Sequence, residues 1–494
     1  MNTSASLAAN RPAPAFASRP HGLFIAGREQ PATDGETMAT VDPMTGADLT
    51  TIAVAGRDDI DAAVRAAHCA FEGPAWGAIG PEQRSRMLNQ IADVIEANAD
   101  ELATLDSLEM GGPLMLTHGM VDHTIEVYRH YAGWPTRIYG ATAPSAPGQL
   151  QYTKRSPLGV VAAIAAWNGP LVQMAYKIAP ALATGNTVVA KPSEQTSLSL
   201  LRLAELIREH TELPDGVLNV VTGPGPSTGE ALITHPNVNK ISFTGSTAVG
   251  KHVLASSARD LKRVTLELGG KSPFIVFEDA DLEAAAFSAA LGFCAGSGQG
   301  CVAGTRILVQ ESIREKFTRL LTENMAGFPL GDPFDPQALM GPLASRSHYE
   351  KVTGYLDLAR QTGGKVTGDT REESDDLFVG PALVTGLDNT SRVAREEIFG
   401  PIAVLLPFQD VEEAVRIAND TVYGLAATVF TKDLSRAHTI ADRLQAGTVW
   451  VNIVNQMSSG PLPFGGFKQS GIGREHGTDV LDAYTETKAV VVNL

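Results

Sequence analysis

Short β-rich runs with apolar centres alternate with helical segments through the middle of this chain. Four runs carry the pattern, at residues 159–167, 186–192, 216–223 and 239–245, and helical stretches such as residues 197–210 separate them. Strands that are apolar on both faces are typical of a parallel sheet that helices cover on both sides. The alternation therefore predicts an α/β fold of the nucleotide-binding type over residues 156–268.

A second series of the same kind follows Gly269 and Gly270. It begins at residues 272–286, continues through 305–325 and reaches 447–452. Because adjacent glycines interrupt regular elements, they mark a natural boundary, and we expect a second α/β domain to begin there. A chain of 494 residues with 44% hydrophobic residues is long enough for two such domains, each with a core of its own.

The charge and the termini limit the partners of this chain. The formal net charge is −16 and the sequence contains no basic block, so we expect no nucleic-acid partner. The longest strongly apolar run, residues 158–167, is too short for a transmembrane helix, which needs about 20 residues. Residues 1–20 are rich in Ala, Pro and Ser and lack the apolar core of a secretory signal, so we expect a flexible N-terminal tail and no membrane partner.

The three cysteines stand in different settings. Cys69 lies in a helical pattern and Cys294 in an apolar one, as buried, inert cysteines do, whereas Cys301 lies among glycines in residues 296–306. The glycines leave room for a substrate and for backbone amides to approach the Cys301 thiol, which favours a nucleophile. Three cysteines form no disulfide framework and none has metal-ligand spacing, so we expect a reducing, cytoplasmic compartment and no metal site.

Two further polar residues end predicted strands. Glu267 stands between Leu266 and Leu268. Apolar neighbours disfavour a charged carboxylate, which suits a general base, although a glutamate at a strand end can also simply face water. Asn168 directly follows the run at residues 159–167 and so stands at the carboxyl end of a predicted strand, where ligands bind in open α/β sheets. Its side-chain amide could donate a hydrogen bond to negative charge that develops on a substrate. The alternative for Asn168 is a plain turn residue before Gly-Pro.

Two turns between a strand and a helix could hold a nucleotide. Residues 243–251 could cradle a pyrophosphate with their glycine and hydroxyl groups. The same stretch matches GxxxxGK, which leaves an ATP-driven P-loop protein as an alternative, but His252 stands where a P-loop needs Ser or Thr. Lys191 and Glu194 follow another strand and could grip a ribose, with Glu194 repelling a 2′-phosphate. A solvated loop is the alternative at both turns.

Seven stretches, taken together and in their order, resemble the NAD(P)-dependent aldehyde dehydrogenase superfamily. They are AAWNGPL, KPSEQT, FTGSTAVG, LELGGKSP, GQGCVAGTR, EEIFGPI and PFGGFKQSGIGRE, and the resemblance spans about residues 22–490. It implies a Rossmann-like NAD-binding domain at residues 21–135 and 156–268, a second α/β catalytic domain at 269–466, and a small β oligomerisation arm at 136–155 and 477–494. We therefore expect a homodimer or homotetramer that oxidises an aldehyde to the carboxylic acid with NAD, through a thioester on a cysteine.

The resemblance also assigns roles position by position. Cys301 is the nucleophile, Glu267 the general base, and Asn168 the oxyanion donor together with the Cys301 backbone N–H. Lys177 and Glu475 form a polar pair that helps proton movement. The cofactor-binding positions are Trp167, Lys191, Glu194, Gly225, Gly245, Ser246, Leu268, Glu397 and Phe399. Of these, Lys191 and Glu194 hold the adenosine ribose, Gly225 the adenine, and Gly245 and Ser246 the pyrophosphate, whereas Leu268, Glu397 and Phe399 surround the nicotinamide end.

Two positions depart from the family pattern. Gly169 replaces the bulky aromatic residue that many relatives have after Trp-Asn, and Gly296 replaces an asparagine. Gly169, together with Met174, Met457 and Phe464 near tunnel positions, implies an apolar pocket for a bulky hydrophobic aldehyde, aromatic or terpenoid. The alternatives are a CoA-acylating semialdehyde dehydrogenase, against which Glu267 counts because those relatives generally lack this base, and a non-catalytic binding protein on the same fold.

Overall fold

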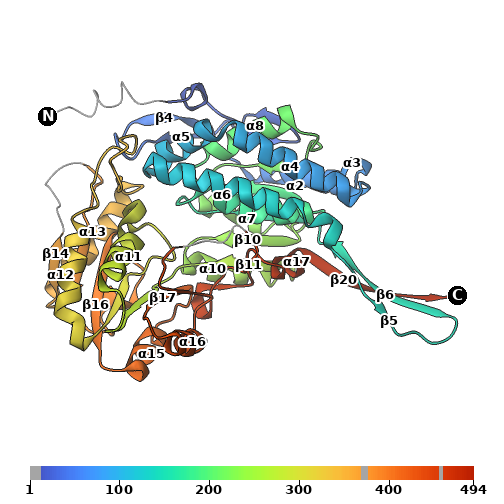
Figure 1. Cartoon of the computed structure of the whole chain (residues 1–494). Coiled ribbons are helices and arrows are strands. Elements are labelled where there is room, and N and C mark those ends of the chain that lie inside the picture. The colour runs from blue at the N-terminus through green and yellow to red at the C-terminus, as the bar shows by residue number, and fades with distance from the viewer. Residues whose placement is uncertain (1–12, 369–375, 456–459) are drawn as a thin grey trace.

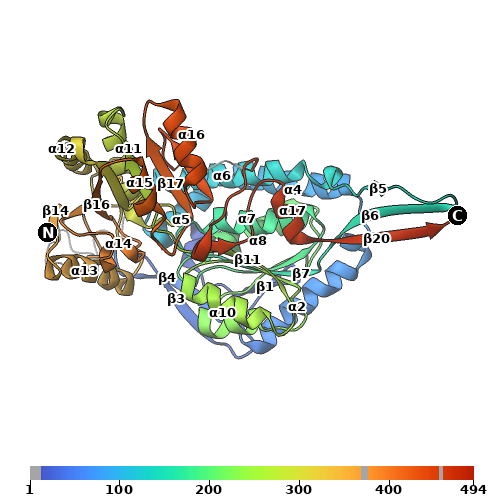
Figure 2. The same ribbon diagram turned by 90° about the horizontal axis from the view of Figure 1, so that it is seen from below.

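Two largely parallel β-sheets, each lying between layers of helices, make up most of the structure (Figure 1). The computed structural model describes residues 13–368, 376–455 and 460–494. An antiparallel ribbon that includes the C-terminus projects from one side of the molecule in both views (Figures 1 and 2). The predicted α/β fold class, with two parallel-sheet units and a small β arm, is confirmed.

The first sheet has the strand order β19-β11-β10-β7-β8-β9-β1-β2. Its central strands run parallel: β7 (Val160–Ile164), β8 (Thr187–Lys191), β9 (Leu218–Val220), β10 (Lys240–Thr244) and β11 (Arg263–Glu267). Antiparallel edges are added by β1 (Leu23–Ile25), β2 (Arg28–Gln30) and β19 (Gly471–Ile472). The chain order reverses between β7 and β10, and ligands bind at such switch points in open α/β sheets.

Successive side chains of β7 enter two different cores. Val161 and Ala163 pack with α4 (Pro81–Ala97), α5 (Ala99–Met110), α6 (Leu114–Ala132), α7 (Pro170–Ala183) and α8 (Leu198–His210). Val160, Ala162 and Ile164 pack with α2 (Arg57–Glu72), α9 (Glu230–Ile233) and α10 (Thr247–Ser257) on the other face. Because both faces are buried, the strand is apolar throughout, as the sequence pattern predicted. The short helices of this unit are α3 (Pro74–Gly77) and α17 (Asp479–Tyr484) with the turns η2 (Pro135–Arg137) and η3 (Gly225–Gly229).

The second sheet has the order β14-β15-β16-β13-β12-β17-β18. Its strands are β12 (Pro273–Val276), β13 (Arg306–Gln310), β14 (Lys365–Gly368), β15 (Ala382–Thr385), β16 (Ile402–Phe408), β17 (Ala426–Phe430) and β18 (Thr448–Val451), all parallel except β14. One face carries α11 (Leu282–Cys294) and α12 (Arg314–Met325); the other carries α13 (Arg346–Gln361), α14 (Arg392–Arg395), α15 (Val411–Asn419) and α16 (Leu434–Arg443). Short turns are η4 (Ala295–Gly298), η5 (Glu311–Ile313) and η6 (Lys468–Ser470).

The projecting ribbon joins two segments that are far apart in the sequence. β20 (Thr485–Asn493) pairs antiparallel with β6 (Gln149–Pro157) over the full length of both strands, and β5 (Thr142–Ala143) pairs with the other edge of β6. A separate hairpin consists of β3 (Thr37–Val41) and β4 (Asp48–Ala53). Strands from the two segments of the expected β arm, at 136–155 and 477–494, thus pair with each other.

The N-terminal segment begins to pack against the rest of the protein at a lower residue number than expected. Residues 15–18 form the turn η1 (Ala15–Ser18), in which Phe16 is buried and its ring stacks on His21. The predicted tail at residues 1–20 is therefore too long at its C-terminal end, because one aromatic side chain anchors this turn. In the described part of the chain, no helix is both long and apolar enough to cross a membrane.

Candidate active site

The predicted site residues lie at the carboxyl ends of neighbouring strands. Asn168 follows β7, Ser246 follows β10 and Glu267 ends β11, and these strands lie side by side at the switch point. Carboxyl ends of parallel strands share one edge of the sheet. The loop with Cys301 reaches this edge from the second unit, since a Cβ placed on Gly270 would lie only 2.3 Å from the Cys301 carbonyl oxygen.

Three successive left-handed residues shape the turn before Cys301. Gly296, Ser297 and Gly298 have φ angles of 58°, 58° and 69°. A Cβ on Gly298 would lie 2.4 Å from a backbone carbonyl of the second unit, so this position accepts only glycine. Ser297 adopts the strained conformation with a side chain, and its Oγ donates to the Gly341 carbonyl oxygen at 2.7 Å. The glycines of this stretch therefore let the nucleophile loop pack at backbone distance.

The surroundings of Cys301 favour a neutral thiol. Burial, followed by the charges of Glu397 and Glu267, raises the pKa of Cys301 to about 12. The backbone N–H groups of Cys301 and Val302 hydrogen-bond to the sulfur and lower the pKa. Both carboxylates therefore lie within electrostatic range of the Cys301 thiol, and a thiol in these surroundings needs a proton acceptor before it can react as a thiolate.

The other two cysteines differ from each other. Cys294 is buried, as predicted, and burial raises the pKa of its thiol. Cys69 is exposed, so the prediction that it is buried was wrong. The reason is its place on α2, whose buried apolar stripe consists of Ile60, Ala63, Val64 and Ala67.

Asn168 lies directly against the nucleophile loop. Its Nδ2 donates to the Gln299 carbonyl oxygen at 2.9 Å, and its Oδ1 accepts a hydrogen bond from Gln173 at 2.8 Å. An amide nitrogen carries two N–H groups, so one is left, within the described part of the chain, for an oxyanion formed at Cys301. The structure thus brings the predicted donor to the nucleophile loop, and it adds Gln173, which the sequence analysis missed.

Glu267 is almost fully buried, and among the described residues neither carboxylate oxygen has a hydrogen-bond partner. Burial first, and then the charge of Glu475, raises its pKa well above the ordinary value, while Lys177 and Arg474 act in the opposite direction. A Cβ on Gly465 would lie 2.8 Å from Glu267 Oε1, so glycine there leaves room for the carboxylate. A raised pKa is what the sequence analysis expected of a general base with apolar neighbours.

A buried ion pair lies beside Glu267. Lys177 Nζ is 2.5 Å from Glu475 Oε1 and also donates to Thr244 Oγ1 at 2.7 Å. Both charged side chains are almost completely buried. Thr244 was not predicted; it is the last residue of β10 and so lies at the same edge of the sheet as the predicted residues.

The predicted ribose-binding side chains differ in exposure. The Lys191 side chain is 3% exposed and that of Glu194 is 37% exposed, with Nζ 3.6 Å from Oε2. Lys191 passes Gly229 of η3, where a Cβ would lie 3.8 Å from it. At Gly225, which opens this turn, no described atom comes within 4 Å of the place that a Cβ would take. The end of β8 and η3 thus border an open space with one charge of each sign.

Gly245 and Ser246 lead into α10. The Ser246 side chain caps this helix by accepting from the Val249 N–H. A helix N-terminus presents free N–H groups and partial positive charge, which suit a phosphate. Leu268 packs against the first turns of α10, since a Cβ on Gly250 would lie 2.4 Å from Leu268 Cδ2.

The second unit contributes Glu397 and an aromatic cluster. Glu397 Oε1 accepts from the Gly270 N–H at 2.9 Å, and burial raises its pKa. Phe399 has a φ of 64° and its carbonyl oxygen lies 2.7 Å from His348 Nε2. The rings of Trp167, His348 and Phe399 contact one another edge-on, with centroids 5.4 to 5.9 Å apart. His348 was missed because nothing in its helical sequence setting marks it; burial lowers its pKa to about 4, so it is neutral.

The comparisons with known proteins agree on one family. The model of the aldehyde dehydrogenase family matches residues 30–490. This chain belongs to the aldehyde dehydrogenase family. An aldehyde dehydrogenase of Agaricus bisporus is 43% identical over 477 residues, which cover 96% of this chain and 95% of that protein. The predicted family and enzyme class are confirmed.

Two solved structures extend this result. The NAD+ complex of an aldehyde dehydrogenase from Bacillus cereus matches with a TM-score of 0.95 at 42% identity, over 97% of this chain and 98% of the other. An indole-3-acetaldehyde dehydrogenase of P. syringae, in complex with NAD+ and IAA, matches with a TM-score of 0.94 at 38% identity over 100% of both chains.

The P-loop alternative gains no support in this aldehyde dehydrogenase. Lys251, the lysine of GxxxxGK, donates to Gln469 Oε1 at 3.0 Å on the protein surface. His252 Nε2 lies 2.6 Å from a carboxylate oxygen of Glu230. Neither side chain turns back over the strand-to-helix turn, as a phosphate-binding lysine would.

The residues predicted to line the substrate pocket lie in different places. Phe464 pairs through its backbone with Glu475. Met174 is 1% exposed and packs in the core of the first unit, so the structure does not place it in a pocket. A helix turns successive side chains by about 100°, and it is Gln173 that faces Asn168. Met457 lies outside the described residues.

Three rings gather beside Phe464 in this enzyme and form a four-ring cluster with it. The His476 ring lies 4.2 Å from Tyr176, 6.2 Å from His123 and 6.4 Å from Phe464, measured between centroids. Burial, then the charges of Glu475 and Cys301, raises the pKa of Tyr176, which places the cluster close to the nucleophile. The sequence analysis missed three of the four rings, although Tyr176 directly precedes the predicted Lys177 on α7.

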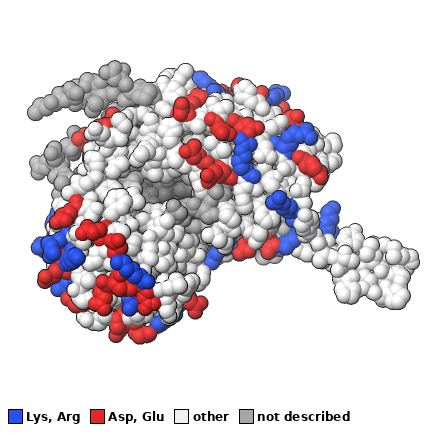
Figure 3. Space-filling view, viewed as in Figure 1, with Lys and Arg blue, Asp and Glu red and all other residues white. Residues whose placement is uncertain are grey.

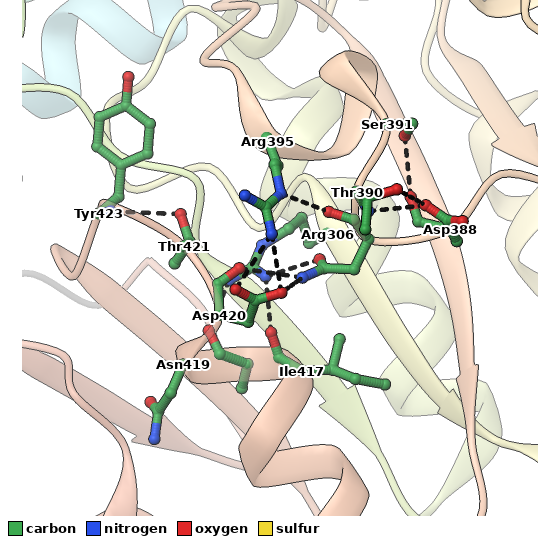
Figure 4. Close-up of polar contacts among 12 residues, drawn as sticks. Arg306, Asp388, Thr390, Ser391, Arg395, Ile417, Asn419, Asp420, Thr421 and Tyr423 are labelled. Atoms are coloured by element: carbon green, nitrogen blue, oxygen red, sulfur yellow. Dashed lines mark hydrogen bonds and ion pairs between the residues drawn. The ribbon is translucent and has the colours of Figure 1, made fainter.

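Arg306 connects the strand that follows Cys301 to neighbouring segments of this aldehyde dehydrogenase, and Figure 4 shows it beside Ile417 and Asp420. It begins β13 and is completely buried, and burial lowers its pKa to about 10, so it stays charged at neutral pH. Its guanidinium donates to the carbonyl oxygens of Lys271 (3.0 Å), Ile417 (2.9 Å) and Ala418 (2.7 Å) and to Asn389 Oδ1 (3.1 Å). The linker between the two sheets and the end of α15 are thereby tied to the strand that follows Cys301.

Proposed function

We propose that this enzyme oxidises an aldehyde to the carboxylic acid with NAD, through a thioester on Cys301. The observation that carries the proposal is the convergence of Cys301, Asn168 and Glu267 at one edge of the first sheet. The Cys301 thiol gives its proton to Glu267 and the thiolate attacks the aldehyde carbon, while the carbonyl oxygen, as it becomes negative, accepts hydrogen bonds from Asn168 and the Cys301 backbone. NAD, when bound, supplies the acceptor for the hydride that leaves the tetrahedral carbon. A thioester remains on the protein.

Glu267 then releases the product. It takes a proton from water, the water oxygen bonds to the acyl carbon, and the carbon–sulfur bond breaks to return Cys301 as a thiolate. A buried carboxyl with a raised pKa suits this role, and its presence favours water over CoA as the acyl acceptor. The adjacent Lys177–Glu475 pair is positioned to move the proton away from Glu267.

The residues at the strand ends fit NAD. Ser246 caps a helix whose N-terminus suits the pyrophosphate, and Lys191 and Glu194 border the open space beside η3. The Glu194 carboxylate is exposed enough to accept hydrogen bonds from ribose hydroxyls and would repel a 2′-phosphate, so we propose NAD rather than NADP. The similar enzymes from Bacillus cereus and P. syringae were solved with NAD+ bound, which supports this choice.

For the substrate, we propose a bulky aldehyde that carries an aromatic ring. The four-ring cluster of His123, Tyr176, Phe464 and His476 offers edges and faces for stacking near Cys301. Gly169 removes a side chain that would crowd this side of Asn168. The similar protein from P. syringae acts on indole-3-acetaldehyde, whose ring system is of this kind.

We also propose a cytoplasmic homo-oligomer assembled through the β5–β6–β20 ribbon. Residues 138–153 and 489–494 contain no charged side chains, and the visible outer part of the ribbon is uncharged, while charges of both signs spread over the rest of this face (Figure 3). Tyr139, Val491 and Leu494 are 74%, 64% and 81% exposed. Within the described residues, β20 has no strand on its outer edge. An apolar strand edge of this kind is suited to pair with a second copy.

The decisive experiment follows NADH formation with purified protein. Cys301→Ala should abolish aldehyde-dependent NADH formation, whereas Cys69→Ala, a control that removes an exposed cysteine far from the site, should leave it unchanged. Aromatic, terpenoid and short aliphatic aldehydes are compared with NAD and with NADP, in the presence and absence of CoA. Activity in Cys301→Ala overturns the mechanism, strict dependence on CoA overturns the hydrolytic step, and a preference for short aliphatic aldehydes overturns the substrate class.

A further inference from the structure

The side chain of Asn168 can point either its oxygen or its nitrogen at the nucleophile loop, and only the nitrogen can stabilise an oxyanion. Side-chain amides are nearly symmetric in shape, so packing alone does not choose between the two orientations. A group that holds the Asn168 oxygen away from Cys301 would decide the orientation.

Gln173 is such a group. It lies in the first turn of α7, and its Nε2 donates to Asn168 Oδ1 at 2.8 Å. The orientation of Gln173 is itself determined, because the backbone N–H of Ala166 donates to its Oε1 at 3.0 Å. A backbone N–H can only donate, so it selects the oxygen end of Gln173 and leaves the nitrogen end for Asn168.

The series of hydrogen bonds ends at a group that can only accept. Asn168 Nδ2 donates to the Gln299 carbonyl oxygen at 2.9 Å, and a carbonyl can only accept. Two side-chain amides thus stand between a backbone donor, Ala166, and a backbone acceptor, Gln299. Only one combination of orientations satisfies all three hydrogen bonds, and it presents the Asn168 nitrogen to the loop with Cys301.

Gly169 makes room for this arrangement. A Cβ on Gly169 would lie 3.1 Å from Val172 Cγ1 and 3.5 Å from Gln173 Nε2. The closer contact is with Val172, and the distance to Gln173 is an ordinary van der Waals contact, so Gly169 lies directly beside the Gln173 amide without crowding it.

We propose that Gln173 is a positioning residue that orients the oxyanion donor Asn168. The inference rests on the role proposed above for Asn168 and adds a residue that acts only through it. Loss of a single oxyanion donor costs roughly 100- to 1000-fold in rate. Loss of the group that orients the donor leaves Gln299 as a partial guide, so the expected cost is smaller, about 10-fold in kcat/KM for the aldehyde.

A double-mutant cycle tests the proposal. Gln173→Met keeps the size of the side chain and removes its hydrogen bonds; Gln173→Glu is a second variant that keeps the shape and accepts at both ends, which reverses the Asn168 amide. Both are made in the wild-type and in the Asn168→Ala background, and kcat/KM for the aldehyde and KM for NAD are measured. Gln90→Met is the matched control, because Gln90 Oε1 also accepts a backbone N–H, that of Glu212, but on α4 away from the site.

The proposal expects both Gln173 variants to lower kcat/KM about 10-fold or more in the wild-type background, to leave KM for NAD unchanged, and to cost nothing further in the Asn168→Ala background. A role in packing would instead lower the rate in both backgrounds. If the losses in kcat/KM from the Gln173 and Asn168 substitutions multiply in the double variant, the proposal is overturned. A Gln173→Met enzyme with wild-type kcat/KM overturns it as well. An inactive wild-type protein, or an active Cys301→Ala variant in the same assay, overturns the proposed function itself, so the two failures are distinguishable.

Discussion

Gly270→Ala tests whether the linker between the two sheets and the Cys301 loop are held at backbone contact. The added Cβ would lie 2.3 Å from the Cys301 carbonyl oxygen, whereas real Cβ atoms essentially never come closer than 3.0 Å to another atom. The carbonyl or the linker must therefore move by about 0.7 Å or more. The crowded oxygen is a backbone atom, so no side chain can rotate away to relieve the contact.

The size of the effect follows from this displacement. A misplacement of about 1 Å at reacting groups costs on the order of 100-fold in rate, so we expect kcat/KM to fall between about 10-fold and 100-fold. Gly300→Ala is the matched control. It also lies next to Cys301, but apart from its two neighbours in the chain no described atom comes within 4 Å of its Cβ position, so we expect a change of at most about twofold.

The assay is NADH formation from a reactive aldehyde, combined with titration of the accessible thiol and a circular dichroism spectrum for each variant. The dichroism spectrum separates a local displacement from a general loss of fold. Wild-type kcat/KM in Gly270→Ala would refute the contact between linker and loop. A loss in Gly300→Ala as large as that in Gly270→Ala would show that any methyl group near Cys301 is harmful, and would refute the reasoning equally.

Two further predictions concern charge. Glu475→Gln removes the like charge beside Glu267 and takes the ion-pair partner from Lys177, and both changes lower the pKa of Glu267. Because the ionised carboxylate is the base, we expect the rise of kcat with pH to move to lower pH. A pH–rate profile that stays in place or moves to higher pH would contradict the coupling between Glu475 and Glu267. Arg306→Met leaves three buried carbonyl oxygens without their donor, so we expect the free energy of unfolding to fall by about 3 kcal/mol and the thermal midpoint to fall with it. Arg392 is exposed, so the control variant Arg392→Met should keep the wild-type midpoint. Equal midpoints for the two variants would contradict the anchoring role of Arg306.

The positions of the reactive groups were largely readable from the sequence. Asn168 and the turn at Ser246 each follow a short β-rich run, and Glu267 ends another; such runs, when helices separate them, favour parallel strands. Because parallel strands end at one edge, residues far apart in the sequence were expected to meet there. Cys301 was recognisable for a different reason, since no helical or strand pattern explained its glycine-rich surroundings.

Two predictions differ from the structure, and in both cases the reason is the direction in which a helix turns the side chain. Met174 was predicted to line the pocket because it lies near tunnel positions of the family, but the structure packs it in the core, one position away from the residue that contacts Asn168. Cys69 was expected to be buried because it lies in a helix, yet it stands off the buried stripe of α2. Side-chain direction depends on the phase of each helix, and residue type alone does not define that phase.

The sequence by itself determined the α/β architecture and the order of the motifs, because burial on both faces of a strand leaves few alternatives, and it supplied the predictions of a nucleophile, a base and an oxyanion donor. Only the tertiary structure decided which polar groups meet. Gln173 orients Asn168, His348 contacts the Phe399 carbonyl, and Arg306 ties the linker to β13. Each of these contacts depends on backbone groups whose polarity and distance arise only when the elements are packed together. The backbone supplies the same donors and acceptors at almost every position, so a sequence carries little sign of which of them a side chain will find.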